Sequence, residues 1–274
     1  MPVFVLSEAL KFPPPRLATP EGLLAVGGDL SRERLLLAYR QGIFPWFSDD
    51  EPVLWWSPDP RLVLYPWEFH RSRSLEKAIR RGAFRVTTDQ AFETVIRECA
   101  GLRTAGGEGT WIVPDMIRAY CDLHRMGVAH SVEAWSGTRL AGGLYGVSLG
   151  SGFFGESMFT REANASKVAL AALAAYLAAE DFELIDCQVT TGHLQRLGAR
   201  EIPRDRYLEE LRRCLKAPTR IGRWTLPAAI LADSPTETLI FGLVSTEALK
   251  VAFARPLMRA LAASAAEMST PASR

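Results

Sequence analysis

The chain has 274 residues, a hydrophobic content of 48% and a formal net charge of +1 at pH 7. This length and composition allow a sizeable buried core and favour two domains rather than one. The near-neutral net charge argues against a general polyanion-binding protein, although it leaves room for a local basic face.

The cysteines and the N-terminal residues limit the cellular setting. The four cysteines, Cys99, Cys121, Cys187 and Cys214, are scattered and form no C-x-x-C pair, which argues against a zinc site and against a disulfide framework. No run of 18 apolar residues occurs, and residues 1–10 lack the pattern of a secretory signal. We therefore expect a cytoplasmic protein with no bound metal and no association with a membrane.

The first 60 residues are rich in proline and tryptophan. Four prolines within residues 11–20 predict an extended segment, and Gly27-Gly28 predicts a glycine turn before a helix over 32–40. Residues 42–60 hold three of the seven tryptophans among four prolines. Aromatic side chains on such a loop form either a plug between domains or the wall of a ligand site.

The middle of the chain predicts an α+β arrangement. The expected elements are a strand over 84–87, helices over 89–100 and 115–126 flanking a glycine-rich loop at 103–110, strands over 130–135, 139–147 and 151–156, a helix over 165–180 and a strand over 183–189. The last five of these read β-β-β-α-β. This order resembles the layout of the superfamily that includes the acetyl-CoA-dependent N-acetyltransferases, an analogy of fold that assigns no function.

Two apolar strands each carry an acidic residue near their centre. Glu156 lies within Gly152–Phe159 and Asp186 within Leu184–Val189. Burial of an unpaired carboxylate is costly, so each needs either a partner in the core or a function. Asp186 and Gln188 are two residues apart and are expected on the same face of their strand. Both interpretations, a paired core carboxylate and a catalytic group, stay open for Glu156 and Asp186.

Basic residues concentrate in two stretches. Residues 61–85 hold seven Lys or Arg against two acidic residues, and residues 196–223 hold nine against four. A solvated face explains such runs, but two basic clusters in a chain of net charge +1 also imply a charge-segregated surface suited to one polyanionic ligand such as a nucleic acid.

Eight motifs in a fixed order resemble the leucyl/phenylalanyl-tRNA–protein transferase family. They are GLLAVGGDL at 22–30, GIFPWF at 42–47, WWSPDPR at 55–61, GTWI at 109–112, HSVE at 130–133, GESMF at 155–159, NASK at 164–167 and LIDCQ at 184–188. The resemblance covers residues 22 to about 211. It implies a small N-terminal domain over 1–61 and an acetyltransferase-like (GNAT-like) mixed-sheet domain over 62–216. Residues 217–274 form an extension of unknown role, with a strand expected over 238–244 and a helix near 255–265.

The resemblance also implies an activity. Members of the family move leucine or phenylalanine, with methionine as a further candidate, from aminoacyl-tRNA to the α-amino group of proteins that begin with Arg or Lys. The product is a destabilising N-terminus that is delivered to the degradation machinery. Because the aminoacyl ester is already activated, we expect no cofactor. A monomer is expected.

Roles for individual residues follow from the same resemblance. Asp186 polarises Gln188, whose carbonyl accepts a hydrogen bond from the attacking amine, and Glu156 faces a cationic N-terminus or the aminoacyl amino group. The residues themselves suggest an apolar pocket of Phe153, Met158, Leu173, Leu177 and Ile185, and each of these taken singly also fits a place in the core. The expected aromatic surfaces for the terminal adenosine or the aminoacyl group are Trp46 and Trp111. The residues expected to bind tRNA are Arg71, Arg73, Lys77, Arg80 and Arg81.

Two other functions are weighed against this one. Acetyl-CoA-dependent N-acetyltransferases place a Gln/Arg-x-x-Gly-x-Gly/Ala turn before their helix, whereas residues 158–164 contain no glycine, which weakens that alternative. A non-catalytic RNA-binding module is the other. A transfer assay with charged tRNA separates all three.

Overall fold

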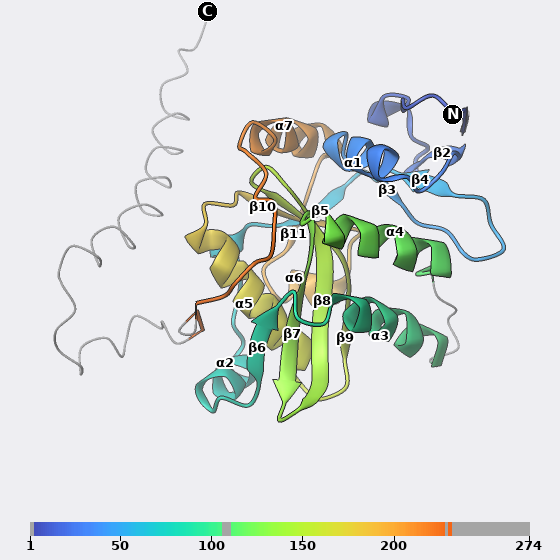
Figure 1. Ribbon diagram of the computed structural model, residues 1–274. Helices are drawn as coiled ribbons and strands as arrows, with labels where there is room; N and C mark the ends of the chain where they lie inside the picture. The colour runs from blue at the N-terminus through green and yellow to red at the C-terminus, as the bar shows by residue number, and fades with distance from the viewer. Residues whose placement is uncertain (1–2, 106–110, 228–229, 232–274) are drawn as a thin grey trace, which may run out of the picture. The chain divides into compact units, whose positions relative to one another are not determined.

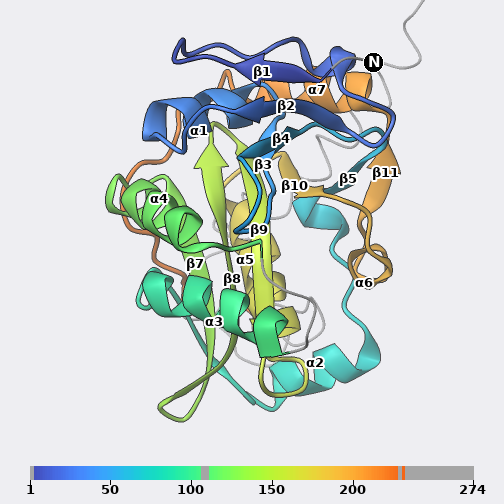
Figure 2. The ribbon, with the colours of Figure 1, turned by 90° about the vertical axis from the view of Figure 1, so that its right-hand side faces the viewer.

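The computed structural model describes residues 3–105, 111–227 and 230–231. Its strands form two sheets, a four-stranded sheet from residues before 57 and a seven-stranded sheet from residue 61 onward (Figure 1, Figure 2). The predicted domain division at residue 61 falls between these sheets and stays a prediction. The strand predicted over 238–244, the helix predicted near 255–265 and residues 106–110 of the predicted loop lie outside the described residues.

The small sheet has the strand order β1-β2-β4-β3. Its elements are β1 (Phe4–Leu6), a 3-10 turn (Pro15–Leu17), β2 (Leu23–Gly27), α1 (Arg32–Arg40), β3 (Phe44–Pro45) and β4 (Leu54–Trp56). The predicted helix over 32–40 is confirmed, and it begins after Ser31, whose hydroxyl accepts a hydrogen bond from the Arg34 N–H at 3.4 Å. Gly27 and Gly28 both have positive φ, as a glycine turn requires, and Gly27 is the last residue of β2.

The large sheet has the order β11-β5-β10-β9-β8-β7-β6. Its strands are β5 (Arg61–Leu64), β6 (Arg85–Thr88), β7 (Ala129–Ser136), β8 (Arg139–Leu149), β9 (Gly152–Thr160), β10 (Leu184–Gln188) and β11 (Arg200–Ile202). β10 pairs in parallel with β9, and every other pairing in this sheet is antiparallel. The predicted β-β-β-α-β order is therefore present as β7-β8-β9-α5-β10.

Helices cover both faces of the large sheet. They are α2 (Arg73–Arg80), α3 (Phe92–Ala105), α4 (Pro114–Arg125), α5 (Ala165–Ala179), α6 (Gly192–Gln195) and α7 (Arg204–Cys214), with a 3-10 turn at Pro66–Glu68. α3 and α4 lie on one face and α5 on the other (Figure 2). α5 is rich in alanine and leucine and is buried on nearly all sides, because the sheet and α2 both pack against it.

The small sheet and α1 pack against the large sheet near β9. One hydrophobic core contains Trp55 of β4, Tyr39 of α1 and Phe154 of β9, all at most 1% exposed. The rings of Tyr39 and Phe154 are 5.1 Å apart between centroids. This packing brings the N-terminal residues to the edge of β9 and β10, where the candidate site lies.

Several elements differ from the sequence-based expectation. α3 begins at Phe92 rather than residue 89, because Asp89 has φ +56° and its buried carboxylate accepts hydrogen bonds from the backbone N–H groups of Ser131 and Trp224. β9 continues to Thr160, beyond the predicted end at 156. β5, α2 and α7 were not predicted, because their segments were analysed only for their many basic residues and not for the periodicity of their apolar residues.

Candidate active site

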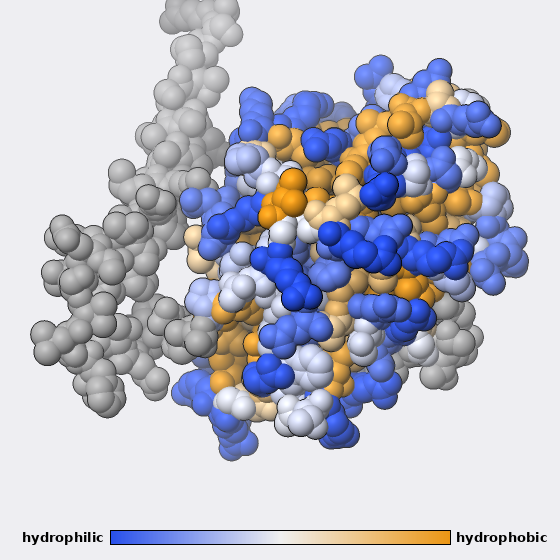
Figure 3. Space-filling model, viewed as in Figure 1, coloured by the Kyte–Doolittle hydropathy of each residue, from blue (hydrophilic) through white to orange (hydrophobic). Residues whose placement is uncertain are grey.

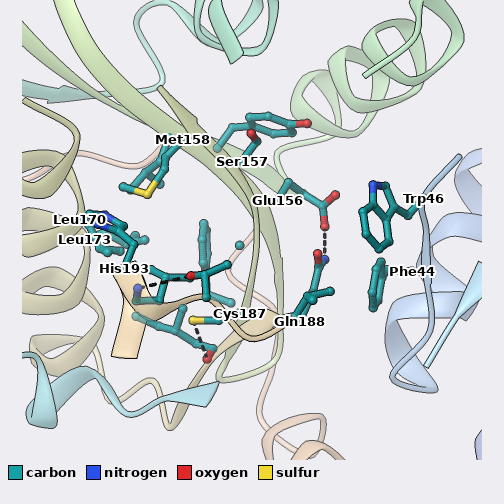
Figure 4. A pocket seen from close by; sticks show the side chains of 18 of the residues that line it. Phe44, Trp46, Glu156, Ser157, Met158, Leu170, Leu173, Cys187, Gln188 and His193 are labelled. Carbon is teal, nitrogen blue, oxygen red and sulfur yellow. Dashed lines mark hydrogen bonds between the residues drawn. The ribbon is translucent and has the colours of Figure 1, made fainter. Parts of the chain in front are cut away.

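A cavity of about 420 Å³ opens between β3 on one side and β9, β10, α5 and α6 on the other (Figure 4). Its walls are mostly apolar. The described residues that line it include Phe44, Trp46, Trp111, Leu144, Phe153, Met158, Leu170, Leu173, Ile185 and Leu194. The polar residues of the lining include Glu156 and Gln188, whose side chains are hydrogen-bonded to each other. Such a cavity suits an apolar group held beside a small polar centre.

Glu156 lies on β9 and is almost completely buried, since the residue is 8% exposed. Oε1 accepts hydrogen bonds from the Tyr39 hydroxyl at 2.7 Å and from Nε2 of Gln188 at 2.7 Å. Oε2 accepts one from the Tyr120 hydroxyl at 2.8 Å. Burial raises the pKa of Glu156 to about 7, although these three donors act in the opposite direction. Glu156 can therefore take up or release a proton near neutral pH.

Gln188 reaches the cavity because the end of β10 is irregular. Its φ is +63°, and the register with β5 shifts between Asp186 and Gln188. The side chain turns toward Glu156, to which its amide nitrogen donates (Figure 4). The carbonyl oxygen of that amide has no hydrogen-bond partner within the described part of the chain. It is therefore available to a donor that enters the cavity.

Asp186 faces away from the cavity. Its Oδ1 accepts from Nε of Arg61 at 2.8 Å, and its Oδ2 accepts from Nη2 of Arg61 at 2.7 Å and from the Tyr207 hydroxyl at 2.7 Å. Asp186 and Arg61 are each 1% exposed. Asp186 touches Gln188 through the backbone, since Oδ1 also accepts from the Gln188 N–H at 2.9 Å. The carboxylate thus fixes the strand end that carries Gln188, and it does not contact the amide of that side chain.

The structure brings most of the predicted pocket residues together. Phe153, Met158, Leu173 and Ile185 line the cavity, and so do Trp46, which is 40% exposed, and Trp111. Leu177 does not line it. It is fully buried in the core between α5 and the sheet, because it lies one helical turn beyond Leu173.

Sequence reasoning missed several residues of the site. Tyr39 and Tyr120 bind Glu156, and Arg61 and Tyr207 bind Asp186. Tyr39 and Arg61 are 117 and 125 residues from their partners along the chain, so no local pattern indicates these contacts. The only available signal was the presence of acidic residues in apolar strands, which requires partners without identifying them.

Cys187 also lines the cavity and shows no sign of reactivity. Burial raises the pKa of its thiol well above the ordinary value, so the thiol stays protonated.

The predicted tRNA-binding residues lie in and beside α2. Arg73, Lys77, Arg80 and Arg81 are exposed, while Arg71 is partly buried and lies 3.9 Å from Glu76. α2 packs through Leu75 on Val168 and Ala171 of α5. Hydrophilic residues gather over this part of the surface, at the lower left of Figure 3. The side chains of Arg73, Lys77, Arg80 and Arg81 therefore face solvent, where a partner can reach them.

Neither a metal cluster nor a membrane helix was found in the described ranges. Among residues 3–105, 111–227 and 230–231, no three His, Cys, Asp or Glu side chains form a group that could hold a metal ion. No helix within these ranges has both the length and the apolar character needed to cross a membrane.

Comparisons with known proteins agree on one family. The family model described as Leucyl/phenylalanyl-tRNA protein transferase matches residues 63–212, and the model of the N-terminal domain of the same family matches residues 28–59. A protein of this name from Anaeromyxobacter sp. (strain Fw109-5) is 61% identical over 83% of this chain and 97% of its own length. The protein of Desulfatibacillum aliphaticivorans is 60% identical over 82% and 97%. The protein of Syntrophobacter fumaroxidans is 62% identical over 76% and 89%. The chain belongs to the leucyl/phenylalanyl-tRNA protein transferase family.

Proposed function

We propose that the protein transfers leucine or phenylalanine, and methionine as a further substrate, from aminoacyl-tRNA to the α-amino group of proteins that begin with Arg or Lys. The observation that carries this proposal is the cavity, in which an apolar wall lies beside the polar pair of Glu156 and Gln188. The names of the relatives agree with it. In the cell, the added residue marks the protein for N-degron-dependent degradation.

The apolar wall selects the aminoacyl side chain. Met158, Leu173 and Ile185 surround the space with flexible side chains, and Phe153 provides a flat surface. The unbranched thioether of Met158 adapts to side chains of different shape, which suits both leucine and phenylalanine.

Gln188 holds the attacking amine. Because Glu156 fixes the amide nitrogen of Gln188, the carbonyl oxygen is oriented to accept a hydrogen bond from the α-amino group. Asp186 supports this arrangement through the Gln188 backbone and through Arg61. In this proposal Asp186 is a positioning residue, whereas Glu156 and Gln188 touch the substrate.

In this proposal the tRNA contacts two sets of residues. Trp46 and Trp111 offer aromatic faces to the terminal adenosine, since stacking on a base needs only a planar ring. Arg71, Arg73, Lys77, Arg80 and Arg81 meet the phosphates of the acceptor stem.

The arrangement of the large sheet supports an acetyltransferase-like (GNAT-like) catalytic domain. Antiparallel strands β7, β8 and β9 lead through α5 to β10, which returns parallel to β9. Acetyl-CoA is not proposed as the donor, because the segment before α5 lacks the glycine turn that cradles pyrophosphate.

A transfer assay with leucyl-tRNA and a peptide that begins with arginine tests the function. We expect the wild type to form the leucyl-peptide and the Gln188→Ala variant to be slower by about 10²-fold or more, the scale of a positioned polar group. Gln195→Ala is the matched control, because Gln195 is exposed and lies outside the cavity. Absence of transfer by the folded wild-type protein, or equal rates for the two variants, would contradict the proposal.

A further inference from the structure

The carboxylate of Glu156 and two tyrosine hydroxyls form a closed ring at the back of the cavity. Tyr39 of α1 donates to Oε1 and Tyr120 of α4 donates to Oε2, at 2.7 and 2.8 Å. The two hydroxyls are also hydrogen-bonded to each other. Tyr39 and Tyr120 are 1% and 0% exposed, so bulk solvent does not reach their side chains. The carboxylate and the two hydroxyls are thus joined by three hydrogen-bond contacts, which are called links below.

The number of hydrogens decides which protonation state fits the ring. If Glu156 is ionised, the ring contains only the two phenol hydrogens, and both point at the carboxylate. The oxygens of Tyr39 and Tyr120 then face each other with no hydrogen between them. If Glu156 is protonated, three hydrogens serve three links, and every group donates once and accepts once around the ring. Only the protonated state satisfies all three links.

We propose that Tyr39 and Tyr120 are positioning residues that make Glu156 a proton store for the transfer reaction. Glu156 accepts the proton that the substrate's α-ammonium group must lose before it can attack. The closed ring with the two hydroxyls then holds that proton inside the protein. This inference rests on the proposed function and adds the origin and the temporary location of one proton.

The charged and titratable groups around Glu156 agree with this role. They are Tyr39 of α1, Tyr120 of α4, Tyr145 of β8 and Asp186 of β10 with its partner Arg61 of β5. Burial and the nearby Glu156 raise the pKa of both Tyr39 and Tyr120 well above the ordinary value, so both keep their hydrogens. Asp186 is neutralised by Arg61, and no cation contacts Glu156 directly within the described residues.

The transfer step balances with one proton stored. A proton passes from the α-ammonium nitrogen to the Glu156 carboxylate, which leaves a neutral amine and a carboxylic acid. The amine forms the new N–C bond with the ester carbonyl carbon, and the C–O bond to the ribose breaks. The second proton of the amine goes to the leaving ribose oxygen. After the products depart, Glu156 releases its proton to water through the cavity, because the residue lines the cavity and is 8% exposed.

Infrared titration of the free protein tests the ring without any substrate. The C=O band of protonated Glu156, assigned by its loss in Glu156→Gln, should disappear with a midpoint near pH 7 in the wild type. In Tyr39→Phe and in Tyr120→Phe we expect the midpoint to fall by about half a unit to one unit, the scale of one net hydrogen bond. The midpoint falls because the variant has only one phenol oxygen. Ionisation of Glu156 then no longer leaves two phenol oxygens facing each other with no hydrogen between them.

Taken separately, the hydrogen bonds from the two hydroxyls lower the pKa of Glu156, so donors that acted independently of each other would give the opposite sign. If each tyrosine only stabilised the carboxylate, loss of either one would raise the midpoint. A raised or unchanged midpoint would therefore overturn the proposal. Tyr65→Phe is the matched control, since Tyr65 donates to Glu210 at 2.8 Å and lies outside the cavity. It should leave the midpoint of Glu156 unchanged.

The pH dependence of transfer separates positioning from simple structural support. At saturating substrate the rate should rise with pH through the Glu156 midpoint, and Tyr120→Phe should move this rise to lower pH. A purely structural role would lower the rate at every pH without moving the rise, which would overturn the proposal. If the infrared shifts appear but charged tRNA supports no transfer, the proposed function is wrong. The hydrogen-bonded ring of Glu156, Tyr39 and Tyr120 would still be supported.

Discussion

Replacement of Glu156 by glutamine should make the folded state progressively more stable, relative to the wild type, as the pH rises from 5 to 8. Burial raises the pKa of Glu156 from its ordinary value of 4.5 to about 7. Between these two pH values the folded protein keeps a proton that the unfolded chain has already released. The free energy of unfolding of the wild type therefore falls as pH rises through this range.

The expected size follows from the width of this range. Each pKa unit corresponds to about 1.4 kcal/mol, so the buried carboxylate of Glu156 costs the folded state about 3 kcal/mol above pH 7. Glutamine has nearly the same shape and carries no charge. The variant also loses part of the hydrogen bonding of Glu156 with Tyr39 and Tyr120. This loss changes the free energy of unfolding by an amount that does not depend on pH. The change with pH, rather than the difference at one pH, is the relevant quantity.

Urea unfolding of both proteins at pH 5, 6, 7 and 8 measures this change. The stability of Glu156→Gln relative to the wild type should increase by about 2.5 kcal/mol over this range, with most of the increase below pH 7. Glu209→Gln, which removes an exposed carboxylate, is the control and should show no such trend. A relative stability that stays constant with pH, or that decreases, would refute the reasoning.

Three further changes test other parts of the site. Asp186→Ala leaves the guanidinium of Arg61 buried without its partner and should lower the free energy of unfolding by about 3–5 kcal/mol, measured by urea unfolding. Arg73→Glu together with Arg80→Glu should weaken tRNA binding by well over tenfold at low salt, measured by filter binding. Leu173→Trp fills the cavity and should reduce transfer of phenylalanine more than of leucine, by about 1–3 kcal/mol in transition-state free energy, measured by competition between the two charged tRNAs.

Each of these three predictions has an outcome that would contradict it. Unchanged stability of Asp186→Ala would mean that Arg61 finds another partner. Unchanged tRNA affinity after charge reversal at Arg73 and Arg80 would mean that the RNA-binding site does not include α2. Arg97→Glu on α3 is the control for a change of net charge alone. Equal losses of leucine and phenylalanine transfer in Leu173→Trp would make Leu173 a core residue.

Local patterns in the sequence determined the central elements of the fold. The order β7-β8-β9-α5-β10 follows from alternating apolar residues, turn sequences and an alanine-rich helix, each of which acts within a few residues. The same patterns drew attention to Glu156 and Asp186, because an acidic residue in an apolar strand is costly wherever the strand lies. β5 was missed, since its four buried residues are too few to outweigh the basic residues around them.

Only the tertiary structure decided how the two carboxylates differ. Alternation along a strand predicts the face of a side chain but not its partner, and the partners Tyr39 and Arg61 lie more than one hundred residues away. The positive φ of Gln188 also breaks the alternation, so that Gln188 turns into the cavity while Asp186 stays in the core. Packing of α1 and α4 against β9 then sets the burial of Glu156, and burial is what brings its pKa near neutral pH.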